Sequence, residues 1–395
     1  MLTSALSLCG ADDGFVPLFD GKTLSGWEVC NGYATYQVED GAIVGTTAEG
    51  SPNTFLCTKK EYGDFILEFE VKVDPELNSG VQIRSHRYPA DTVVRVVESG
   101  KVVEHKQKAG RFYGYQVEIS NEASGTSGGI YDEARRGWLH DISSDPQARA
   151  AFKDNQWNRY RVAAVGDSIK TWVNGVPCAD LVDPLDQSGF IGLQVHQIEG
   201  SRRLQVRWRN IRIKDQGRHV WKRVWDGKTL NGWSKRGGGA WTIEDGALHA
   251  VGTTADPRVG FLVSDRDFGD VTARIKFKIL KGNSGFFLRA DKETLAAYEV
   301  EIGADKRTGG FWETGGRNWV TGPEDNLAVK AGEWNEMTAS VHGHRIVFHV
   351  NGMRTVDLPN DAAGRTEGRL ALQVHGKWDT DIWFKDIEVL ESEPK

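Results

Sequence analysis

The chain contains one sequence pattern twice, and this duplication constrains the fold more than any other feature. The motif Asp-Gly-Lys-Thr-Leu-x-Gly-Trp occupies positions 20–27 and returns unchanged at 226–233. Shorter motifs follow each occurrence in the same order: Asn-Ser-Gly at 78–80 and 283–285, Val-Asn-Gly at 173–175 and 350–352, and Leu-Gln-Val-His at 193–196 and 372–375. A period of about 200 residues is too long for a solenoid. The sequence therefore predicts two copies of one domain.

The duplication sets the expected domain boundaries. Copy one is predicted at 12–216, with a hairpin insertion at 86–113, and copy two at 217–395. Each copy is long enough to bury its own core. Residues 1–11 look like the end of a secretory signal without its basic region, which predicts a periplasmic or extracellular protein.

Short strands are predicted along nearly the whole chain. Segments such as 65–73 and 271–278 alternate apolar and polar residues and are bounded by Gly, Asn or Asp. The 14 Trp and 46 Gly also favour a turn-rich β protein. Many short strands with long gaps between partners indicate a two-sheet antiparallel sandwich in each copy.

Copy one carries an insertion that copy two lacks. Between Ser85 and Gly114 lie 28 residues, whereas Ala290 and Ala297 enclose only six. Ser99-Gly100, between two strand-like runs, is a hairpin signature. The insertion is either an arm that packs on another domain or chain, or a lid over the first site.

Composition excludes several classes of protein. The net charge is -6 with scattered basic residues, so no nucleic-acid-binding surface is expected. The sequence has no run of 18 apolar residues, so no membrane span is expected. The cysteines are Cys9, Cys30, Cys57 and Cys178 without a CxxC motif, which argues against a zinc ribbon. Cys30 and Cys57 could pair in an oxidising compartment, but spacing leaves this open.

Alternation along strands identifies candidate site residues. If Val81 and Ile83 point into the core, Gln82 and Arg84 face outward. The same rule turns outward Gln116, Glu118, Gln194 and His196, and in copy two Arg289, Glu299, Glu301, Gln373 and His375. An Arg, a Glu and a His on one sheet face could surround a small polar ligand. The alternative is an ordinary solvated face, and the Asp-Gly-Lys-Thr-Leu-x-Gly-Trp motif is interpreted as a structural turn with a buried Trp.

Several motifs together carry a resemblance to a known family. They are Pro17–Trp27, Asn78–Val81, Gly114–Ile119, Trp157–Tyr160, Ile191–His196 and Arg209–Ile213, with counterparts in copy two. On these motifs the chain resembles two tandem members of the 3-keto-disaccharide hydrolase family. The resemblance implies an all-β fold of two tandem concanavalin A-like jelly-roll sandwiches. The family often has Asp between the Gln and the His, whereas Val195 and Val374 stand there in this chain, so any role of that Asp is absent.

The resemblance implies a 3-keto-glycoside substrate, and this changes the chemistry required. A carbonyl at C3 acidifies the C2 hydrogen, so one base can remove it and expel the C1 substituent. Addition of water to the resulting enone completes a net hydrolysis, which makes the activity that of a hydrolase or of a lyase and hydratase. The site needs a base, a positive group for the enolate oxygen and a proton donor for the leaving group.

These requirements assign roles. His196 or His375 is expected as the base, Arg84 or Arg289 as the enolate stabiliser, and Glu118 or Glu301 as proton donor or orienting group; exchanged Glu and His roles stay open. Candidates for substrate binding, including aromatic rings that could stack on a sugar, are Gln82, Gln116, Gln194, Tyr131, Trp138, Glu299, Trp312, Trp319, Gln373 and Trp378. No cofactor or metal site is assigned, although a divalent metal held by the Glu and His could replace the Arg. No nicotinamide or flavin motif is present, so an upstream sugar 3-dehydrogenase would have to make the keto group.

Two other functions remain in view. Ordinary glycoside hydrolysis needs two carboxylates flanking the bond, and copy one offers only Glu118, although copy two offers Glu299 and Glu301. The Glu-x-Asp-x-x-Glu strand of laminarinase-like sandwich enzymes is absent from both copies. A lectin-like module that binds glycans without turnover is the main alternative, and one catalytic copy beside one binding copy is also plausible.

Overall fold

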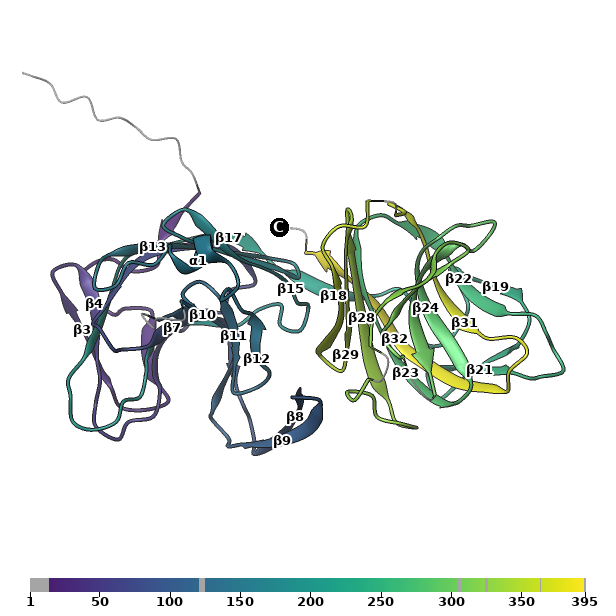
Figure 1. The fold of residues 1–395 in the computed structure, drawn as a ribbon, viewed down its shortest axis with the longest axis horizontal. Helices are drawn as coiled ribbons and strands as arrows, with labels where there is room; N and C mark the ends of the chain where they lie inside the picture. The colour runs from purple at the N-terminus through teal and green to yellow at the C-terminus, as the bar shows by residue number, and fades with distance from the viewer. Residues whose placement is uncertain (1–13, 121–124, 305–306, 324–325, 363, 394–395) are drawn as a thin grey trace, which may run out of the picture. The chain divides into compact units, whose positions relative to one another are not determined.

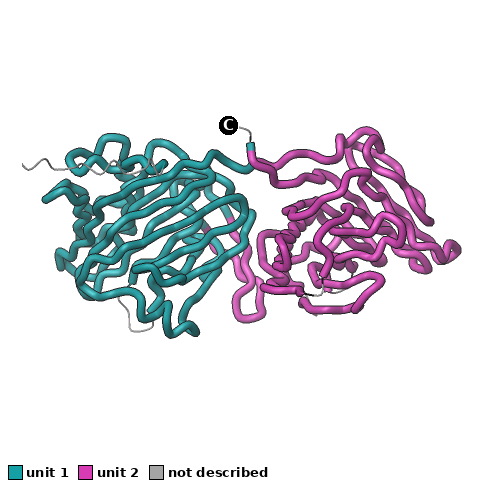
Figure 2. Tube along the Cα trace, turned by 90° about the horizontal axis from the view of Figure 1, so that it is seen from above, with its two compact units in different colours: residues 1–92, 107–219, 393–395 teal, residues 93–106, 220–392 magenta. Residues whose placement is uncertain are grey.

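The structure, a computed structural model, is built almost entirely of β-strands (Figure 1). It describes residues 14–120, 125–304, 307–323, 326–362 and 364–393. The predicted leader at 1–11 therefore lies outside the described residues. The chain forms two compact units (Figure 2). Unit 1 comprises residues 1–92, 107–219 and 393–395, and unit 2 comprises 93–106 and 220–392.

Unit 1 is a sandwich of two antiparallel sheets. The β6 sheet has the order β15(Val176–Val182), β14(Ser168–Val173), β13(Asn158–Val165), β6(Asp64–Val73), β17(Gln205–Gly217), β4(Ala42–Thr46), β3(Thr35–Glu39), with β1(Val16–Pro17) on β17. The β7 sheet has the order β12(Gly137–His140), β11(Ile130–Glu133), β10(Phe112–Ile119), β7(Ser79–Arg87), β16(Phe190–Val195), β5(Thr54–Thr58), β2(Trp27–Cys30). One helical turn, α1(Pro146–Arg149), begins at Asp145, whose carboxylate caps it.

Unit 2 repeats this order strand for strand. Its β23 sheet has the order β20(Ala240–Glu244), β21(Ala247–Gly252), β32(Thr380–Ser392), β23(Val271–Lys281), β28(Asn335–His342), β29(Arg345–Val350), β30(Met353–Leu358), with β18(His219–Arg223) on β32. Its β24 sheet has the order β19(Trp233–Gly237), β22(Gly260–Phe268), β31(Gly368–Val374), β24(Asn283–Ala290), β25(Ala297–Gly303), β26(Phe311–Thr314), β27(Asn318–Thr321). The expected all-β fold of two jelly-roll sandwiches is confirmed.

The core of each unit lies between its two sheets. In unit 1, Leu67 and Phe69 of β6 meet Val81 and Ile83 of β7, and all four side chains are buried in one apolar cluster. Each strand contributes alternate residues to this layer, because successive side chains point to opposite faces of a sheet. The residues between them, such as Gln82, therefore lie on the outer face of the β7 sheet.

The repeated motif at the start of each copy is a structural turn, as predicted. The Asp20 carboxylate accepts hydrogen bonds from the backbone N–H groups of Lys22 and Thr23 at 2.8 and 2.7 Å. Trp27 is buried, and its indole N–H donates to the Leu18 carbonyl at 3.1 Å. In copy two, Asp226 and Trp233 make the corresponding bonds, so the motif forms the same structural turn in both copies.

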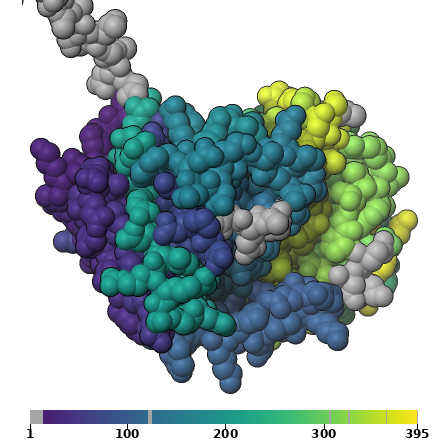
Figure 3. Space-filling view, turned by 60° about the vertical axis from the view of Figure 1, so that its left-hand side comes forward, coloured from purple at the N-terminus to yellow at the C-terminus, as the bar shows by residue number. Residues whose placement is uncertain are grey.

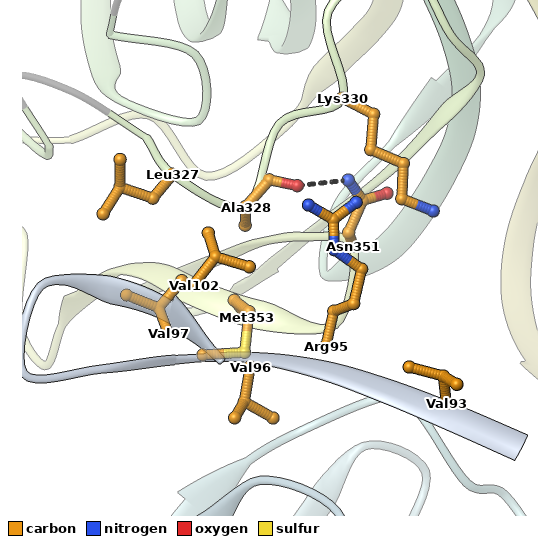
Figure 4. Close-up of a pocket in the computed structure, with 10 residues that line it drawn as sticks. All are labelled: Val93, Arg95, Val96, Val97, Val102, Leu327, Ala328, Lys330, Asn351 and Met353. Carbon is orange, nitrogen blue, oxygen red and sulfur yellow. Dashed lines mark hydrogen bonds between the residues drawn. The ribbon is translucent and has the colours of Figure 1, made fainter. Parts of the chain in front are cut away.

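The predicted hairpin in the insertion is present as β8(Thr92–Glu98) and β9(Lys101–Gln107). Ser99 and Gly100 both have positive φ, as a two-residue hairpin turn requires. Much of the hairpin is exposed, and it forms the blue ridge at the lower edge of Figure 3. Its residues 93–106 belong to unit 2, where they line a cavity of about 200 Å³ together with residues such as Leu327 and Met353 (Figure 4). Residues 93–106 of the insertion thus group with unit 2.

The described part of the chain contains neither a disulfide nor a candidate membrane-spanning helix. Cys30, Cys57 and Cys178 are free thiols, so the Cys30–Cys57 disulfide is not formed, and Cys9 lies outside the described residues. In the described part of the chain, no helix has the length and apolar character that crossing a membrane requires.

A hydrogen-bonded pair of asparagines, one of them buried, closes the same loop in both copies. Asn158 Oδ1 accepts from the Lys153 N–H at 2.7 Å and from Asn174 Nδ2 at 2.8 Å, and Asn158 Nδ2 donates to the Lys153 carbonyl at 2.8 Å. Asn335 and Asn351 form the same network in unit 2. The repeated Val-Asn-Gly motif therefore fixes a loop by side-chain hydrogen bonds.

Replacing the central asparagine is expected to destabilise unit 1. Asn158→Ala leaves several buried backbone and side-chain groups without partners and should cost about 2–4 kcal/mol. Urea unfolding followed by tryptophan fluorescence measures the loss. Lys153→Ala keeps the backbone groups that Asn158 binds and serves as the control; equal effects of the two variants would contradict the role of the network.

Candidate functional site

Arg84 does not face outward, so the predicted cluster of Arg, Glu and His on one surface is wrong in this part. Its side chain is 0% exposed. The guanidinium donates to the carbonyls of Gly63 at 2.8 Å and Gly166 at 2.6 Å, and it pairs with Asp64 at 3.1 Å. These partners lie on and beside the β6 sheet, so Arg84 ties the two sheets of unit 1 together.

A β-bulge explains the reversed direction of Arg84. The residue has φ +46°, and the register between β7 and β16 shifts beside it, between the pairs of Phe190 and Gly192. An inserted residue changes which side chains point inward. The one sequence signal is a glycine seven residues before each repeated histidine: a Cβ at Gly189 would lie 2.4 Å from the Arg84 carbonyl carbon.

Arg289 repeats this arrangement in unit 2. It has φ +52° and is 1% exposed. Its guanidinium donates to the carbonyls of Gly343 at 2.8 Å and Val341 at 3.3 Å, and it pairs with Asp270 at 3.1 Å. Neither arginine is therefore directed to a ligand on the outer sheet face, and the prediction of an enolate-stabilising arginine is corrected in both copies.

The other predicted polar residues do share the outer face of the β7 sheet. Glu118 of β10 lies opposite Gly80 of β7. Gln194 of β16 lies on the other side of Gly80, because Leu193 pairs with Val81 in an antiparallel register. We call Glu118, Gly80 and Gln194 the Glu-Gly-Gln row of copy one. Adjacent strands are about 4.8 Å apart, so the glycine separates the two polar side chains and adds none of its own.

Hydrogen bonds hold the carboxylate of this row. Asn78 Nδ2 donates to Glu118 Oε1 at 2.6 Å, and Gln116 Nε2 donates to Glu118 Oε2 at 3.0 Å. Gln82 Nε2 in turn donates to Gln116 Oε1 at 2.8 Å. The expectation of a wet face is wrong, because all of these glutamine and glutamate side chains are buried by their neighbours on the sheet. The face holds an ordered polar network in a poorly hydrated setting.

The Gln194 amide is unsatisfied. Gln194 is 0% exposed, and neither its Oε1 nor its Nε2 has a hydrogen-bond partner in the described structure. Leaving a buried polar group unpaired costs about 1–3 kcal/mol. In copy two, Oε1 of the equivalent Gln373 is also buried without a partner. Both copies thus keep an amide available for a polar ligand.

Copy two contains the same row with one added carboxylate. Glu301 lies opposite Gly285, and Gln373 follows on the next strand. Asn283 Nδ2 donates to Glu301 Oε1, as Asn78 does to Glu118. Glu299 takes the place of Gln116, and its Oε2 accepts a hydrogen bond from Thr314 Oγ1 at 2.5 Å.

Burial changes the protonation of Glu299. Desolvation, followed by the negative charge of Glu301, raises the pKa of Glu299 from its ordinary value of 4.5 to about 8, against the opposing effect of the Thr314 hydroxyl. At neutral pH this side chain is a protonated carboxylic acid. A pKa near the working pH is typical of general acids and bases.

The two repeated histidines are held in one tautomer. His196 Nδ1 lies 2.7 Å from the Gln197 carbonyl oxygen, and His375 Nδ1 lies 2.6 Å from that of Gly376. A carbonyl only accepts, so in the neutral ring the hydrogen is on Nδ1 and the lone pair is on Nε2. The backbone N–H of His375 donates to the backbone carbonyl of Asn283 at 3.4 Å, so the histidine lies beside the asparagine that binds Glu301. Neither histidine bonds directly to its glutamate among the described residues.

Aromatic rings end the same sheet face. Tyr131 lies opposite Gln116, and its ring packs edge-on against the 42% exposed Trp138 at 5.3 Å. In copy two, Trp312 lies opposite Glu299 and Trp319 lies opposite Trp312. Trp378 is 51% exposed and contacts the His375 ring at 5.9 Å. These positions suit stacking on a sugar ring.

Sequence reasoning missed two groups of the site. Asn78 and Asn283 were recognisable only as part of the repeated Asn-Ser-Gly motif, and Thr314 had no counterpart, because copy one has Glu133 at that place in the register. Within the described ranges, no group of three or more His, Cys, Asp or Glu side chains is arranged to hold a metal ion.

The family model described as "3-keto-alpha-glucoside-1,2-lyase-like domain" matches residues 14–214 and 220–390. No curated protein matches the chain significantly.

Similar solved structures include a Parabacteroides distasonis ATCC 8503 protein provisionally described as a glycosyl hydrolase. It is 20% identical over 44% of this chain and 100% of that chain, with a TM-score of 0.34. The carbohydrate-binding module CBM66 from Bacillus subtilis is 20% identical over 40% of this chain and 93% of that chain, with a TM-score of 0.32. A Bacillus subtilis protein of unknown function with a galectin-like fold is 14% identical over 42% of this chain and 92% of that chain, with a TM-score of 0.35.

The two bulge arginines are expected to act on stability. Arg84→Met leaves Asp64 buried without its guanidinium and should cost about 3–5 kcal/mol, whereas Arg289→Met should cost less because Asp270 is 60% exposed. Urea unfolding measures both, with the exposed Arg202→Met as the control. An Arg84→Met midpoint equal to that of the control would contradict the structural role.

The protonation of Glu299 predicts a pH dependence. The folded state holds this proton up to about pH 8, whereas the unfolded chain loses it near 4.5. The associated stabilisation is complete below pH 4.5 and is lost as the pH rises to 8, by roughly 3–5 kcal/mol. Wild type minus Glu299→Gln, measured by urea unfolding across this range, isolates the effect, and the exposed Glu333→Gln is the control. Parallel stability curves for wild type and Glu299→Gln would contradict the shifted pKa.

Proposed function

The chain belongs to the 3-keto-alpha-glucoside-1,2-lyase-like domain family, and from this membership we propose that it cleaves 3-keto-glycosides by elimination and hydration. One observation carries the proposal: in each copy a buried glutamine with unpartnered amide atoms (both atoms of Gln194, and Oε1 of Gln373) shares a row with a hydrogen-bonded glutamate. Such an amide can bind a sugar oxygen and compensates the cost of its burial only when it does so.

The proposed reaction is balanced without an external oxidant or reductant. A base removes the C2 proton, which the C3 carbonyl has acidified, and the electron pair forms the C1–C2 double bond. The bond between C1 and the glycosidic oxygen breaks, and the leaving oxygen takes up a proton. Water then adds across the double bond of the enone, which gives the free 3-keto sugar. The net result is hydrolysis, and the first step alone is that of a lyase.

The chain's own residues can supply the base and the enolate donor of this reaction and can orient the sugar. The Nε2 lone pair of His196 or His375 is suited to accept the C2 proton. The Gln194 amide, whose Nε2 has no partner, replaces the arginine of the sequence-based hypothesis as the donor to the enolate oxygen in copy one, and Gln373 holds the equivalent position in copy two. Glu118 and Glu301, each held by an asparagine amide, orient the sugar hydroxyls. Exposed rings such as Trp138 and Trp378 flank the site and would stack on the sugar.

The substrate has to be supplied by another enzyme. Oxidation at C3 of a sugar requires a redox cofactor, and the sequence contains no nicotinamide or flavin motif. A sugar 3-dehydrogenase acting upstream is the expected partner reaction. The signal-like sequence at 1–11 supports the further proposal that both steps take place outside the cytoplasm.

The proposal predicts cleavage that depends on the keto group. Wild-type protein is expected to release glucose from 3-keto-trehalose or 3-keto-sucrose and none from trehalose or sucrose. In D₂O the sugar product should carry one deuterium at C2, because the C2 proton is exchanged through solvent. Replacing both amides, Gln194→Leu with Gln373→Leu, should lower the rate about 10²–10³-fold, and the exposed Gln147→Leu is the control.

Two results would refute the proposal. Release without deuterium at C2 would indicate direct hydrolysis rather than elimination. No release from any keto-glycoside, together with measurable affinity for glycans, would assign the protein to carbohydrate binding without turnover.

A further inference from the structure

The two copies differ at one position in the centre of the site. Gln116 and Glu299 occupy equivalent places, each two residues before the glutamate of the Glu-Gly-Gln row on the same strand. In both copies this side chain lies over the glycine of the row: a Cβ on Gly80 would meet the Gln116 amide at 2.6 Å, and one on Gly285 would meet Glu299 Oε1 at 2.3 Å. The exchange of amide for carboxyl therefore takes place where a ligand on the row would bind.

In copy one the amide is fixed and cannot release a proton. Gln116 Nε2 donates to Glu118, and Gln116 Oε1 accepts from Gln82 at 2.8 Å. Both ends of the side chain are used, and an amide does not titrate near neutral pH. This arrangement holds Glu118 as an acceptor and offers no acid.

In copy two the surroundings have changed together with the residue. Phe287 stands in the place of Gln82, and Ala371 stands in the place of Gly192. Phe287 cannot donate a hydrogen bond, and it belongs to a small apolar cluster on the sheet face. Glu299 is thus kept dry, while its Oε2 is bound by Thr314 and its Oε1 is turned over Gly285.

The charges around Glu299 favour a held proton. On its own strand Glu301 is the neighbouring charge. The adjacent strands present Gly285 and Phe287 on one side and Trp312 and Thr314 on the other, and none of these side chains titrates. Among the described residues no cation lies against Glu299 to stabilise its ionised form. The carboxyl group of Glu299 therefore keeps its proton and faces the Glu-Gly-Gln row.

We propose that copy two is the catalytic copy, with Glu299 as the acid that protonates the leaving oxygen, and that copy one binds the same sugar without cleaving it. This inference rests on the proposed function. In the elimination step the bond from C1 to oxygen breaks as Glu299 Oε1 gives its proton to that oxygen. The C2 proton goes to the base on the far side of the row, and its electron pair forms the C1–C2 bond. Water returns a proton to Glu299 during hydration.

The arrangement of the strands gives the acid and the base separate places. Glu299 and Glu301 lie on β25 and Gln373 lies on β31, with β24 between the two strands, and His375 follows Gln373 by two residues, just beyond the end of β31. Positions two apart on a strand are about 7 Å from each other. A sugar ring bound on this face would therefore have Glu299, whose Oε1 lies over Gly285, on one side and His375 on the other.

The substitution Glu299→Gln gives copy two the residue of copy one, and it tests the proposal. Cleavage of 3-keto-trehalose should fall at least 100-fold, whereas calorimetry with the same variant should still find two 3-keto-trehalose molecules bound per chain. The retained stoichiometry shows that an inactive variant is folded. Glu333→Gln, an exposed glutamate of unit 2, should match wild type. The wild-type rate should also decline above about pH 8, where Glu299 loses its proton.

Each other outcome overturns one specific statement. A Glu299→Gln variant that keeps half or more of the wild-type rate would show that the acid lies elsewhere or that copy one also turns over. One bound sugar per chain would remove the binding role of copy one. Wild-type protein that cleaves no keto-glycoside would refute the proposed function itself, and this inference would fall with it.

Discussion

The β-bulge occupied by Arg84 and Arg289 determines which side chains reach the candidate site. At each bulge a buried guanidinium satisfies carbonyls of the opposite sheet and pairs with an aspartate. Alternation before the bulge turns Gln82, or Phe287 in copy two, to the outer face, and the bulge then directs the next polar residue between the sheets. Within three consecutive residues, one strand therefore carries both the side chain on the outer face and the buried arginine that links the two sheets.

The side chains on the outer face are both polar and buried, and this combination strengthens the interactions that they can make. Carboxylates and amides that would be weak partners in water interact strongly where neighbouring side chains exclude solvent. Glu118 and Glu301 are stabilised by asparagine donors, whereas Gln194 and Gln373 keep unsatisfied atoms. The network is thus complete on one side of each glycine and incomplete on the other.

The sequence was sufficient for the fold and for half of the site. Duplicated motifs and strand alternation predicted two β-sandwiches, and they put Gln82, Gln116, Glu118 and Gln194 on one face. Alternation failed at Arg84 because a bulge is an insertion of one residue that leaves no compositional trace except Gly189 on the partner strand. The protonation of Glu299 could not be foreseen either, because it depends on burial and on Thr314 from another strand.

The β8–β9 hairpin belongs to a different compact unit from the strands on either side of it, and this affects how the chain can be divided. Residues 93–106 are encoded within copy one but belong to the compact unit of copy two. If the chain were divided at the repeat boundary, the β8–β9 hairpin would stay with copy one. Val93 and Val102 would then lose the unit 2 residues that line the same cavity. The β8–β9 arm is therefore a structural reason to keep both copies in one polypeptide.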